Sequence, residues 1–456
     1  MASKHKNNLG SLLFVAPSAY PLGGVAIWLR YVLHGLSDQG FVVHLGLLSG
    51  HFHKPSEYLA KHRFDTNKVD VVSIKAQSGS REGRVASIVQ TIEKLDVDIV
   101  VSVNAPDTFE AGNRVKTRYK PSLKVVMTLH GLEVDYFLDI QAHQEQIDAV
   151  IATNRLTCLM IEEWANFPPQ QILYAPYGVE IPIKDALEKK QCKEVSAPLT
   201  ILYAGRIEQE QKRINDLISL VIELEKNNFS YHLLLAGSGN QTDVVVAELK
   251  NQVIEGRLTY LGDLSHAELF EKGYAVADVL VLLSDWETGP IVIWEAMAHG
   301  IAVVSSQYKG SVAEGALIHD ENTLLFPIGD FQTAANAVMN LNDKILRQRL
   351  VKNAYDLVLS RYSRERSIKQ WVAVMTMTME NIDAKPATDW RQSWQKQGRI
   401  ERLLGYELGN KVRRLTRKSV LINDAGSEWP HSLSRVSDEI DQSFRQALNE
   451  VEGIDV

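Results

Sequence analysis

Short apolar runs alternate with longer amphipathic stretches along most of this chain, and this alternation constrains the fold more than any other feature. In the first half the runs lie at 11–16, 41–48, 98–103, 124–130 and 149–154. In the second half they lie at 199–205, 231–237, 257–262, 278–284 and 301–306. Short buried strands joined by amphipathic helices are typical of parallel sheets. The sequence therefore predicts an α/β fold with two Rossmann-like, doubly wound parallel-sheet domains.

The pattern pauses over a polar stretch at 177–198, which we interpret as the hinge between the two domains. A chain of 456 residues is also too long for one ordinary core. In such a pair, the carboxyl ends of the strands are expected to line a central cleft. The predicted segments are an N-terminal domain (1–178), a linker (179–198), a C-terminal domain (199–360), a helix crossing back to the N-terminal domain (361–382) and a helical, partly basic extension (383–456).

Composition excludes several classes of protein. The net charge of −7, with acidic and basic residues mixed along the chain, argues against nucleic-acid binding as the main task. Cys158 and Cys192 are the two cysteines, too few for a disulfide framework or a cysteine zinc site, and we expect a cytoplasmic protein.

Membrane contact is expected to be peripheral. The apolar run near the N-terminus is broken at Pro17 and Pro21, and no stretch reaches the roughly 18 unbroken apolar residues of a spanning helix. The segment 398–421 mixes basic and apolar residues, which fits an anionic membrane surface or a partner protein. A helix packed on the N-terminal domain would explain the same pattern.

The stretch "WETGPIVIWEAMAHG" (286–300) contains Glu287 and Glu295, and carries the clearest chemical signal. A proline at its start and Gly300 at its end predict a helix over 290–299, beginning at the proline. Amides at its N-terminus, those of Ile291 and Val292, are expected to bind a phosphate. Glu295 is then placed to accept hydrogen bonds from a ribose diol, and Glu287 to reach hydroxyls on a group attached to the phosphates. The stretch therefore predicts a site for a nucleotide that carries a sugar.

The longer segment "ETGPIVIWEAMAHGIAVVSS" resembles the signature of the retaining glycosyltransferases of family 4, which have the GT-B fold and are also called glycosyltransferase group 1. It departs from the family at Ile301 and Ala302, where a residue and a proline are usual. The resemblance implies a donor site that includes Gly289 with the two glutamates. It also implies transfer with retention of configuration. The sequence offers no DxD-type metal site in the right context, so we expect activity without a metal ion or a cofactor.

Two other segments of the second half resemble the same family. In "LYAGRIEQEQKRINDLI" the resemblance implies that Arg206 and Lys212 neutralise the donor diphosphate. Fixed cations aimed at a leaving group that gains negative charge would lower the barrier. Arg213 stands where the family often has glycine, so Lys212 and Arg213 remain alternatives for this contact. In "YHLLLAGSGNQ" the resemblance implies that Gly237 and Gly239 let the backbone approach the nucleotide.

The first domain contributes fewer residues. The resemblance places Gly23 and Gly24 against the donor phosphates and His130 beside the transferred sugar. Tyr177 stands where the family usually has asparagine, in a segment concerned with the hinge. The alternatives are structural: the glycines serve a turn and the histidine a buried strand end. Likewise, Glu287 could support the helix N-terminus, and Arg206 and Lys212 could be solvated charges.

The combined interpretation is a glycosyltransferase that moves a sugar from a nucleotide diphosphate sugar to a glycan, a lipid-linked acceptor or a protein, in glycan or surface polysaccharide synthesis. Two alternatives stay open. One is an epimerase or phosphorylase on the same fold. The other is a non-catalytic subunit that binds nucleotide sugar or holds a partner transferase.

Overall fold

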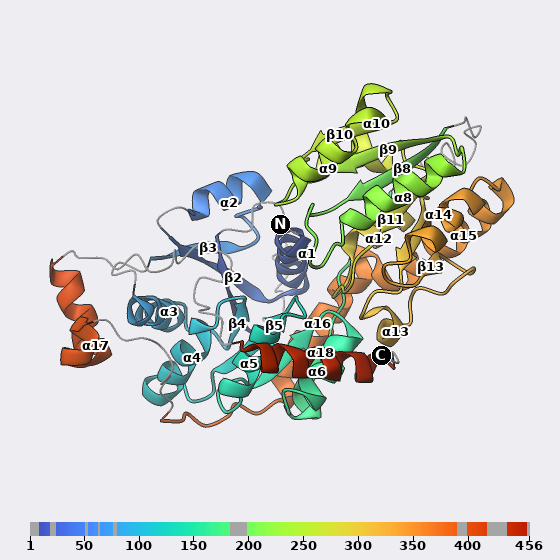
Figure 1. Cartoon of the computed structure of the whole chain (residues 1–456). Helices are drawn as coiled ribbons and strands as arrows, with labels where there is room; N and C mark the ends of the chain where they lie inside the picture. Colours follow the sequence, from blue (N-terminus) through green and yellow to red (C-terminus); the bar gives the residue numbers. More distant parts are fainter. Residues whose placement is uncertain are drawn as a thin grey trace. The chain divides into compact units, whose positions relative to one another are not determined.

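The computed structural model of the chain describes residues 9–18, 24–50, 53–62, 64–75, 80–182, 198–389, 399–416 and 436–453. Its contacts divide the chain into two compact units, each built on one sheet (Figure 1). The first unit comprises Met1–Thr153, Thr157–Ala175 and Ile368–Ala447. The second comprises Asn154–Leu156, Pro176–Ser367 and Leu448–Val456.

The first unit contains a seven-stranded sheet in the order β3-β2-β1-β4-β5-β6-β7 among the described residues. All of its strand pairs are parallel. The strands are β1 (Ser11–Pro17), β2 (Val42–Ser49), β3 (Asp70–Lys75), β4 (Ile99–Val103), β5 (Lys124–Leu129), β6 (Ala149–Ala152) and β7 (Ile172–Tyr174). The helices between them are α1 (Gly24–Gln39), α2 (Pro55–His62), α3 (Arg81–Leu95), α4 (Asp107–Arg118), α5 (Val134–Ala142), α6 (Arg155–Glu163) and η1 (Pro169–Gln171).

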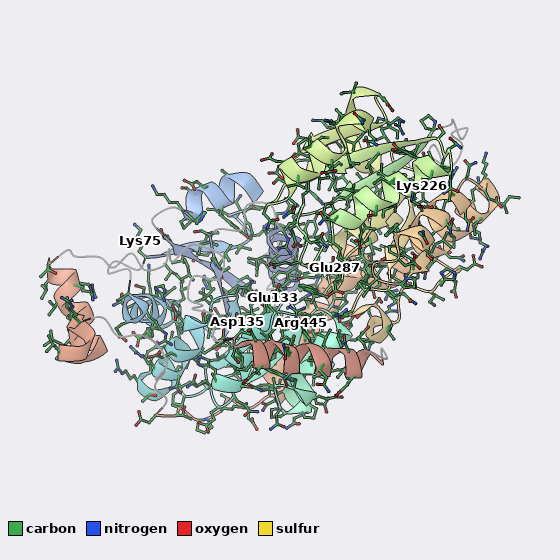
Figure 2. All side chains as sticks on the ribbon, viewed as in Figure 1. Lys75, Glu133, Asp135, Lys226, Glu287 and Arg445 are labelled. Atoms are coloured by element: carbon green, nitrogen blue, oxygen red, sulfur yellow. The ribbon has the colours of Figure 1, made fainter. Side chains whose placement is uncertain are left out.

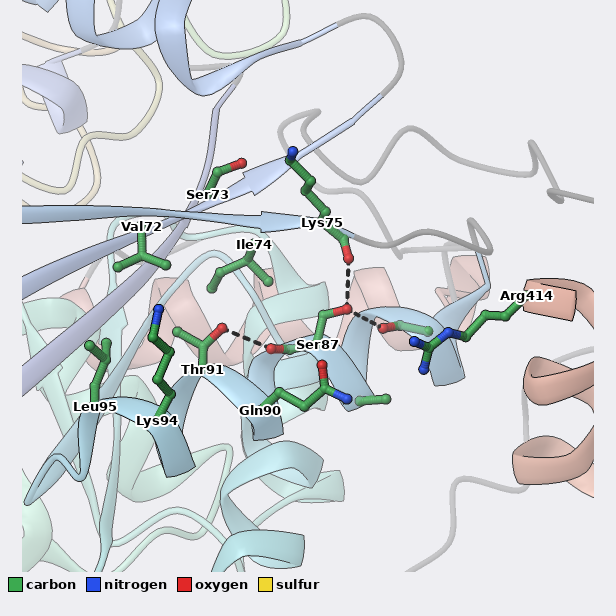
Figure 3. A pocket seen from close by; sticks show the side chains of 12 residues that line it. Val72, Ser73, Ile74, Lys75, Ser87, Gln90, Thr91, Lys94, Leu95 and Arg414 are labelled. Atoms are coloured by element: carbon green, nitrogen blue, oxygen red, sulfur yellow. Dashed lines mark hydrogen bonds between the residues drawn. The ribbon is translucent and has the colours of Figure 1, made fainter. Parts of the chain in front are cut away.

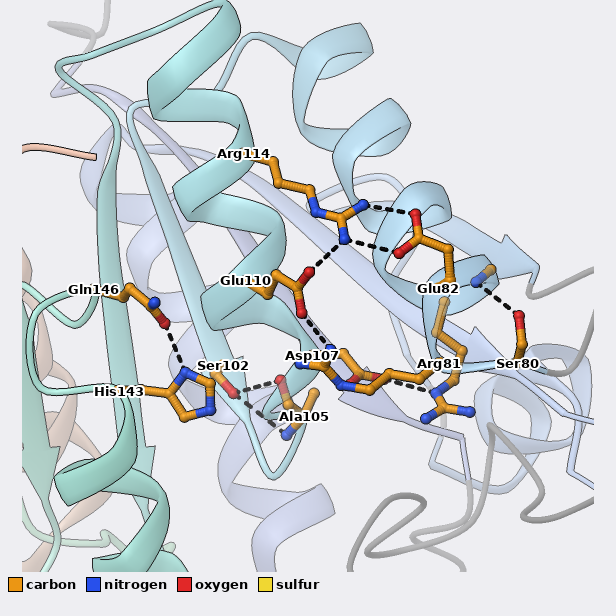
Figure 4. A network of polar contacts seen from close by, with 12 residues as sticks. Ser80, Arg81, Glu82, Ser102, Ala105, Asp107, Glu110, Arg114, His143 and Gln146 are labelled. Carbon is orange, nitrogen blue, oxygen red and sulfur yellow. Dashed lines mark hydrogen bonds and ion pairs between the residues drawn. The ribbon is translucent and has the colours of Figure 1, made fainter. Parts of the chain in front are cut away.

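Helices α3 and α4 pack through paired charges (Figure 4). Arg84 Nε donates to Asp107 Oδ2 at 2.6 Å, and Arg114 donates to Glu82 at 2.7 Å and 2.8 Å. Arg81 and Arg114 both donate to Glu110. Buried charges are tolerated when they are paired and hydrogen-bonded in this way. The network therefore fixes how these two helices lie against each other.

The chain returns to the first unit after the second sheet. Helix α16 (Arg364–Asn381) brings Trp371 to 4.9 Å from Trp28, measured between ring centroids. The segment that follows, 383–389, forms hydrogen bonds with the first unit. The Lys385 amide donates to the buried Asp148 carboxylate at 2.6 Å, and Thr388 exchanges two hydrogen bonds with Asn113. These residues belong to the fold of the first unit.

The second unit contains a six-stranded parallel sheet in the order β10-β9-β8-β11-β12-β13. The strands are β8 (Leu199–Ala204), β9 (Tyr231–Ala236), β10 (Leu258–Gly262), β11 (Val279–Leu282), β12 (Ala302–Ser306) and β13 (Leu324–Phe326). The helices are α8 (Asn215–Lys226), α9 (Thr242–Glu248), α10 (Lys250–Ile254), α11 (His266–Leu269), η2 (Phe270–Tyr274), α12 (Ile291–Ala298), α13 (Ser311–Glu314), α14 (Phe331–Asn340), α15 (Lys344–Leu357) and η3 (Val358–Tyr362).

Both faces of the second sheet are buried. Alternate residues of β8 show this: Ile201 and Tyr203 belong to one buried cluster with helices α8 and α14, and Leu202 belongs to another with α12. Strands covered on both faces read as continuous apolar runs, because successive side chains point to opposite faces. This accounts for the runs in the sequence and confirms the expectation of two parallel-sheet, Rossmann-like folds.

Two further helices lie in the expected extension. Helix α17 (Arg399–Thr416) is interrupted at Gly405, whose φ of 72° and ψ of 171° are non-helical. Helix α18 (Asp438–Glu452) buries Phe444 against Phe137 and Trp164 in the first unit. Among the described residues, no helix is long and apolar enough to cross a membrane.

Candidate active site

The site predicted in the second unit lies at the carboxyl ends of β8 and β11. The strand order reverses between these two neighbours, and such a switch point is where open α/β sheets bind ligands. Arg206 follows β8 by two residues, and Glu287 lies on the loop that follows β11. The topology therefore brings together two predicted residues that are far apart in the sequence.

Glu287, labelled in Figure 2, forms an ion pair with Lys212 in this loop cluster. Lys212 Nζ lies 2.5 Å from Glu287 Oε1, and Ser284 Oγ donates to the same oxygen at 2.6 Å. The Glu287 residue is only 6% exposed. Charge-assisted hydrogen bonds are among the stronger ones in proteins, so the carboxylate is held in one orientation.

Sequence reasoning missed Gln211, which links the two loops. Its amide oxygen accepts from the Arg206 guanidinium, and its Nε2 donates to the Trp286 carbonyl at 2.9 Å. Glu208 holds the turn itself, because its carboxylate accepts from the Gln211 and Lys212 backbone amides at 3.2 Å and 3.0 Å. The run "RIEQEQKR" (206–213), with two acidic and three basic residues, contains both, but a charged run does not indicate which of its side chains turns inward.

Arg213, the alternative to Lys212, has a different partner. Its Nε donates to Asp216 Oδ2 at 2.7 Å, and its backbone has a φ of 49°. Asp216 lies in the first turn of α8, so Arg213 braces that helix start. Of these two basic residues, Lys212 is the one paired with Glu287.

Helix α12 starts one residue later than predicted. Pro290 has a ψ of 89° and lies before the helix, so its place as the first helical residue was wrong. Its carbonyl accepts from the Ile293 amide at 2.9 Å. The amides of Ile291 and Val292 have no acceptor within the helix, as at every helix start. Gly289, with a φ of 125°, makes the turn that leads into it.

Glu295 is engaged more fully than expected. His266 Nε2 lies 2.6 Å from its Oε1, and the Tyr274 hydroxyl donates to its Oε2 at 2.8 Å. The residue is 5% exposed. Each carboxylate oxygen has two lone pairs, so these two contacts do not use the full acceptor capacity of the carboxylate. Neither His266 nor Tyr274 belonged to a motif in the sequence.

The two glycines after β9 have a packing role. A Cβ atom on Gly237, whose φ is 122°, would lie 1.9 Å from the Gly205 carbonyl oxygen. A Cβ atom on Gly239 would lie 2.2 Å from the Ile207 carbonyl oxygen. Both glycines therefore let this loop lie directly against the loop that carries Arg206.

With this geometry established, comparison with known proteins gives a consistent family. Residues 185–357 match the family model for glycosyl transferases group 1. N-acetyl-alpha-D-glucosaminyl L-malate synthase of Bacillus anthracis is 24% identical over 379 residues, covering 79% of this chain and 96% of the relative. The comparisons support glycosyltransferase function, and residues 185–357 are similar to the group 1 glycosyltransferases.

Two further similarities concern this glycosyltransferase. Amylovoran biosynthesis glycosyltransferase AmsK of Erwinia amylovora is 25% identical over 239 residues, covering 48% of this chain and 55% of the relative. The crystal structure of Anabaena HepE in complex with UDP and glucose matches with a TM-score of 0.63 at 19% identity. That match covers 80% of this chain and 99% of HepE. It concerns the fold, which is GT-B as predicted.

The predicted residues of the first unit have a plain structural environment in this glycosyltransferase. His130 follows β5, lies 3.0 Å from the Thr128 hydroxyl and packs on the Trp28 ring, with centroids 4.3 Å apart. Burial lowers the pKa of His130 to about 3, so its imidazole is neutral. Gly24 is the first residue of α1, and Gly23 lies outside the described residues.

Metal binding was not expected. Among the described residues, no group of three or more histidine, cysteine, aspartate or glutamate side chains is arranged to hold a metal ion. Activity without an added metal ion stays a prediction, which measurements with and without EDTA would test.

Proposed function

We propose that this glycosyltransferase uses a nucleotide diphosphate sugar as donor and transfers the sugar with retention of anomeric configuration. The observation that carries the proposal is the buried ion pair of Lys212 and Glu287 beside the start of α12. It places a cation, a carboxylate and two helix-start amides within one loop cluster. The cation and the helix-start amides suit a diphosphate, and the carboxylate suits a sugar hydroxyl.

Each group then has a role. Arg206, Lys212 and the amides of Ile291 and Val292 stabilise the diphosphate as the bond from sugar C1 to the phosphate oxygen breaks. The acceptor oxygen forms the new bond to C1, and its proton passes to the leaving phosphate. Glu287 accepts from a sugar hydroxyl, and the remaining lone pairs of Glu295 accept from the ribose.

The relatives suggest which donor and product to test first. HepE is known in complex with UDP and glucose, and AmsK acts in amylovoran biosynthesis. We therefore infer a UDP-sugar as the first candidate donor and a glycan or surface polysaccharide as the product.

The decisive experiment is a panel of nucleotide diphosphate sugars, followed by thermal shift and by slow donor hydrolysis, with and without EDTA. We expect one donor to raise the melting temperature of the wild type and to be hydrolysed slowly, and EDTA should change neither result. In Glu287→Gln and in Glu295→Ala, the rise in melting temperature and the hydrolysis rate should each be reduced at least about tenfold. Stabilisation without turnover, even with acceptor extracts, would favour the non-catalytic binding subunit. Product with an inverted anomeric centre in the NMR spectrum would refute retention alone.

We also propose that α17 places the enzyme on an anionic membrane surface. Its sequence RIERLLGYELGNKVRRLT holds five basic and two acidic residues, although the whole chain is acidic. Leu403 and Leu415 are 84% and 83% exposed, and Leu404 and Leu408 are exposed as well. Exposed leucines beside cations on one helix favour the interface of an anionic bilayer.

A pocket beside α17 supports the same choice of partner (Figure 3). It has a volume of about 290 Å³ and lies between β3, α3 and Arg414 of α17. Lys75, Lys94 and Arg414 line it, and none of the described residues that line it is acidic. The pocket thus extends the positive charge of α17 onto the edge of the first sheet, where lipid phosphates would be attracted.

A further inference from the structure

Glu452, in the last turn of α18, is a buried carboxylate that belongs to the second unit. It is 4% exposed, and the Ala313 amide donates to its Oε1 at 3.1 Å. Burial is the larger influence and raises the pKa of Glu452, while backbone hydrogen bonds from Ala313, Gly310 and Val312 lower it. The carboxylate therefore faces the amides at the start of α13, where a helix is partly positive.

The segment just before α13 is joined to the loop of Glu287. The Glu287 amide donates to the Lys309 carbonyl at 3.1 Å, and the Lys309 amide donates to the Asp285 carbonyl at 2.8 Å. Gly310 lies so close that a Cβ atom on it would be 2.5 Å from the Glu287 carbonyl oxygen. Any shift of 309–310 would therefore move the Glu287 backbone.

Gly310 is held from two directions. Its carbonyl accepts from Asn154 Nδ2 at 3.2 Å, while its amide faces Glu452. Its φ of 105° is one that L side chains rarely adopt, so the turn is specified by the glycine and by what anchors it. Glu452 supplies one of those anchors from the distant C-terminal helix.

We infer that Glu452 is a positioning residue, which fixes the 309–310 segment and through it the orientation of Glu287 toward the donor sugar. This rests on the proposed role of Glu287 in sugar binding. No contact of Glu452 with the donor is implied. Tyr308 provides a second indication of proximity: burial is the main cause that raises the pKa of its hydroxyl, and the nearby charges of Glu287, Glu314 and Glu452 raise it further.

The first test needs no ligand. Hydrogen exchange is compared for the full-length wild type, Glu452→Ala, Glu452→Gln and the control Glu450→Ala, which alters an exposed glutamate on the same helix. We expect Glu452→Ala to speed amide exchange about tenfold at 309–314 and also at 285–287. A tenfold change corresponds to the loss of roughly one hydrogen bond. Glu452→Gln keeps an acceptor oxygen and should stay within twofold of the wild type. Faster exchange at 309–314 with an unchanged exchange rate at 285–287 would overturn the inference.

The second test separates positioning from general stability. Affinities are measured for the donor selected by the panel and for the free nucleoside diphosphate, which lacks the transferred sugar. We expect Glu452→Ala to weaken the nucleotide sugar about tenfold and the free diphosphate by less than twofold. Equal weakening of both would indicate a structural role only and overturn the inference. If the wild type binds neither, the proposed function fails, whereas the exchange experiment still decides the role of Glu452.

Discussion

Lys212 Nζ lies 2.5 Å from Glu287 Oε1, and neither side chain is more than 15% exposed. Removing one member of such a pair leaves the other charge buried without compensation, which costs about 3 kcal/mol or more. We therefore expect Lys212→Met to lower the free energy of unfolding by roughly that amount in urea titrations. Arg213→Met, which affects the pair with Asp216, should cost less than about 1 kcal/mol because that pair is more exposed.

The double variant Lys212→Met/Glu287→Gln makes the test specific. It should recover most of the lost stability, because no buried charge remains, while donor hydrolysis stays at least about a hundredfold below the wild type. A double variant as unstable as the single one would show that the two side chains are not energetically coupled.

Gly237→Ala should be strongly destabilising, because the new Cβ atom would meet the Gly205 carbonyl oxygen and the backbone has a positive φ. We expect a loss of more than about 2 kcal/mol, combining strain and overpacking. Gly256→Ala is the matched control, since that glycine has a φ of 72° but nothing within 4 Å of a Cβ atom. Its cost should be about 1 kcal/mol. Equal melting temperatures for the two variants would contradict the packing role.

Buried His130 should make the protein sensitive to acid. Its pKa falls from the ordinary 6.5 to about 3 through burial, so the unfolded chain takes up a proton first as the pH falls. Stability from this group is present above pH 6.5 and is lost on acidification toward pH 3, by about 1.4 kcal/mol per pH unit at most. Between pH 7 and pH 5, the melting temperature of His130→Phe should fall less than that of the wild type. Parallel curves would contradict the neutral, buried state.

Vesicle sedimentation of the full-length enzyme tests the membrane proposal. We expect binding to vesicles that contain about 30 mol% phosphatidylglycerol and only weak binding to vesicles of pure phosphatidylcholine. Salt at about 0.5 M should abolish the binding, because it screens the charges. Leu408→Asp/Leu415→Asp should reduce binding at least about tenfold. The control Ile345→Asp, at a residue 80% exposed on α15, should leave it unchanged. Equal binding by both variants would exclude α17 as the contact.

The central strands of both sheets could be predicted from the sequence, whereas β10 is the one edge strand of the two described sheets that was predicted. Each of the ten apolar runs corresponds to a strand, and nine of these are central strands, which have no polar alternation where both faces are buried. Strand β3 was missed, since it lies at a sheet edge and most of its residues are partly exposed. The strands β7 and β13 have three residues each, too few for a recognisable run.

The site was predicted in part for a similar reason. Motifs identified Lys212 and Glu287 as separate residues, and only the adjacency of β8 and β11 makes them a pair. The partners of Glu295 come from 266–274, a segment with no motif, so spacing along the chain could not reveal them. Glu452 lies 165 positions beyond Glu287 (452 minus 287), and no local pattern connects the two.

The hydrogen bonds of 383–389 with the first unit have a consequence for biosynthesis. Asp148 and Asn113 are translated early, but Lys385 and Thr388, which bond to them, follow the whole of Pro176–Ser367. Domains generally fold as units during synthesis, at about 5–20 residues per second. At that rate the synthesis of Pro176–Ser367 takes on the order of ten seconds or longer, and during this time the first unit lacks the hydrogen bonds of Lys385 and Thr388. In this enzyme the first unit is therefore the first to be synthesised in part, but its hydrogen bonds are complete only after Thr388 has been added.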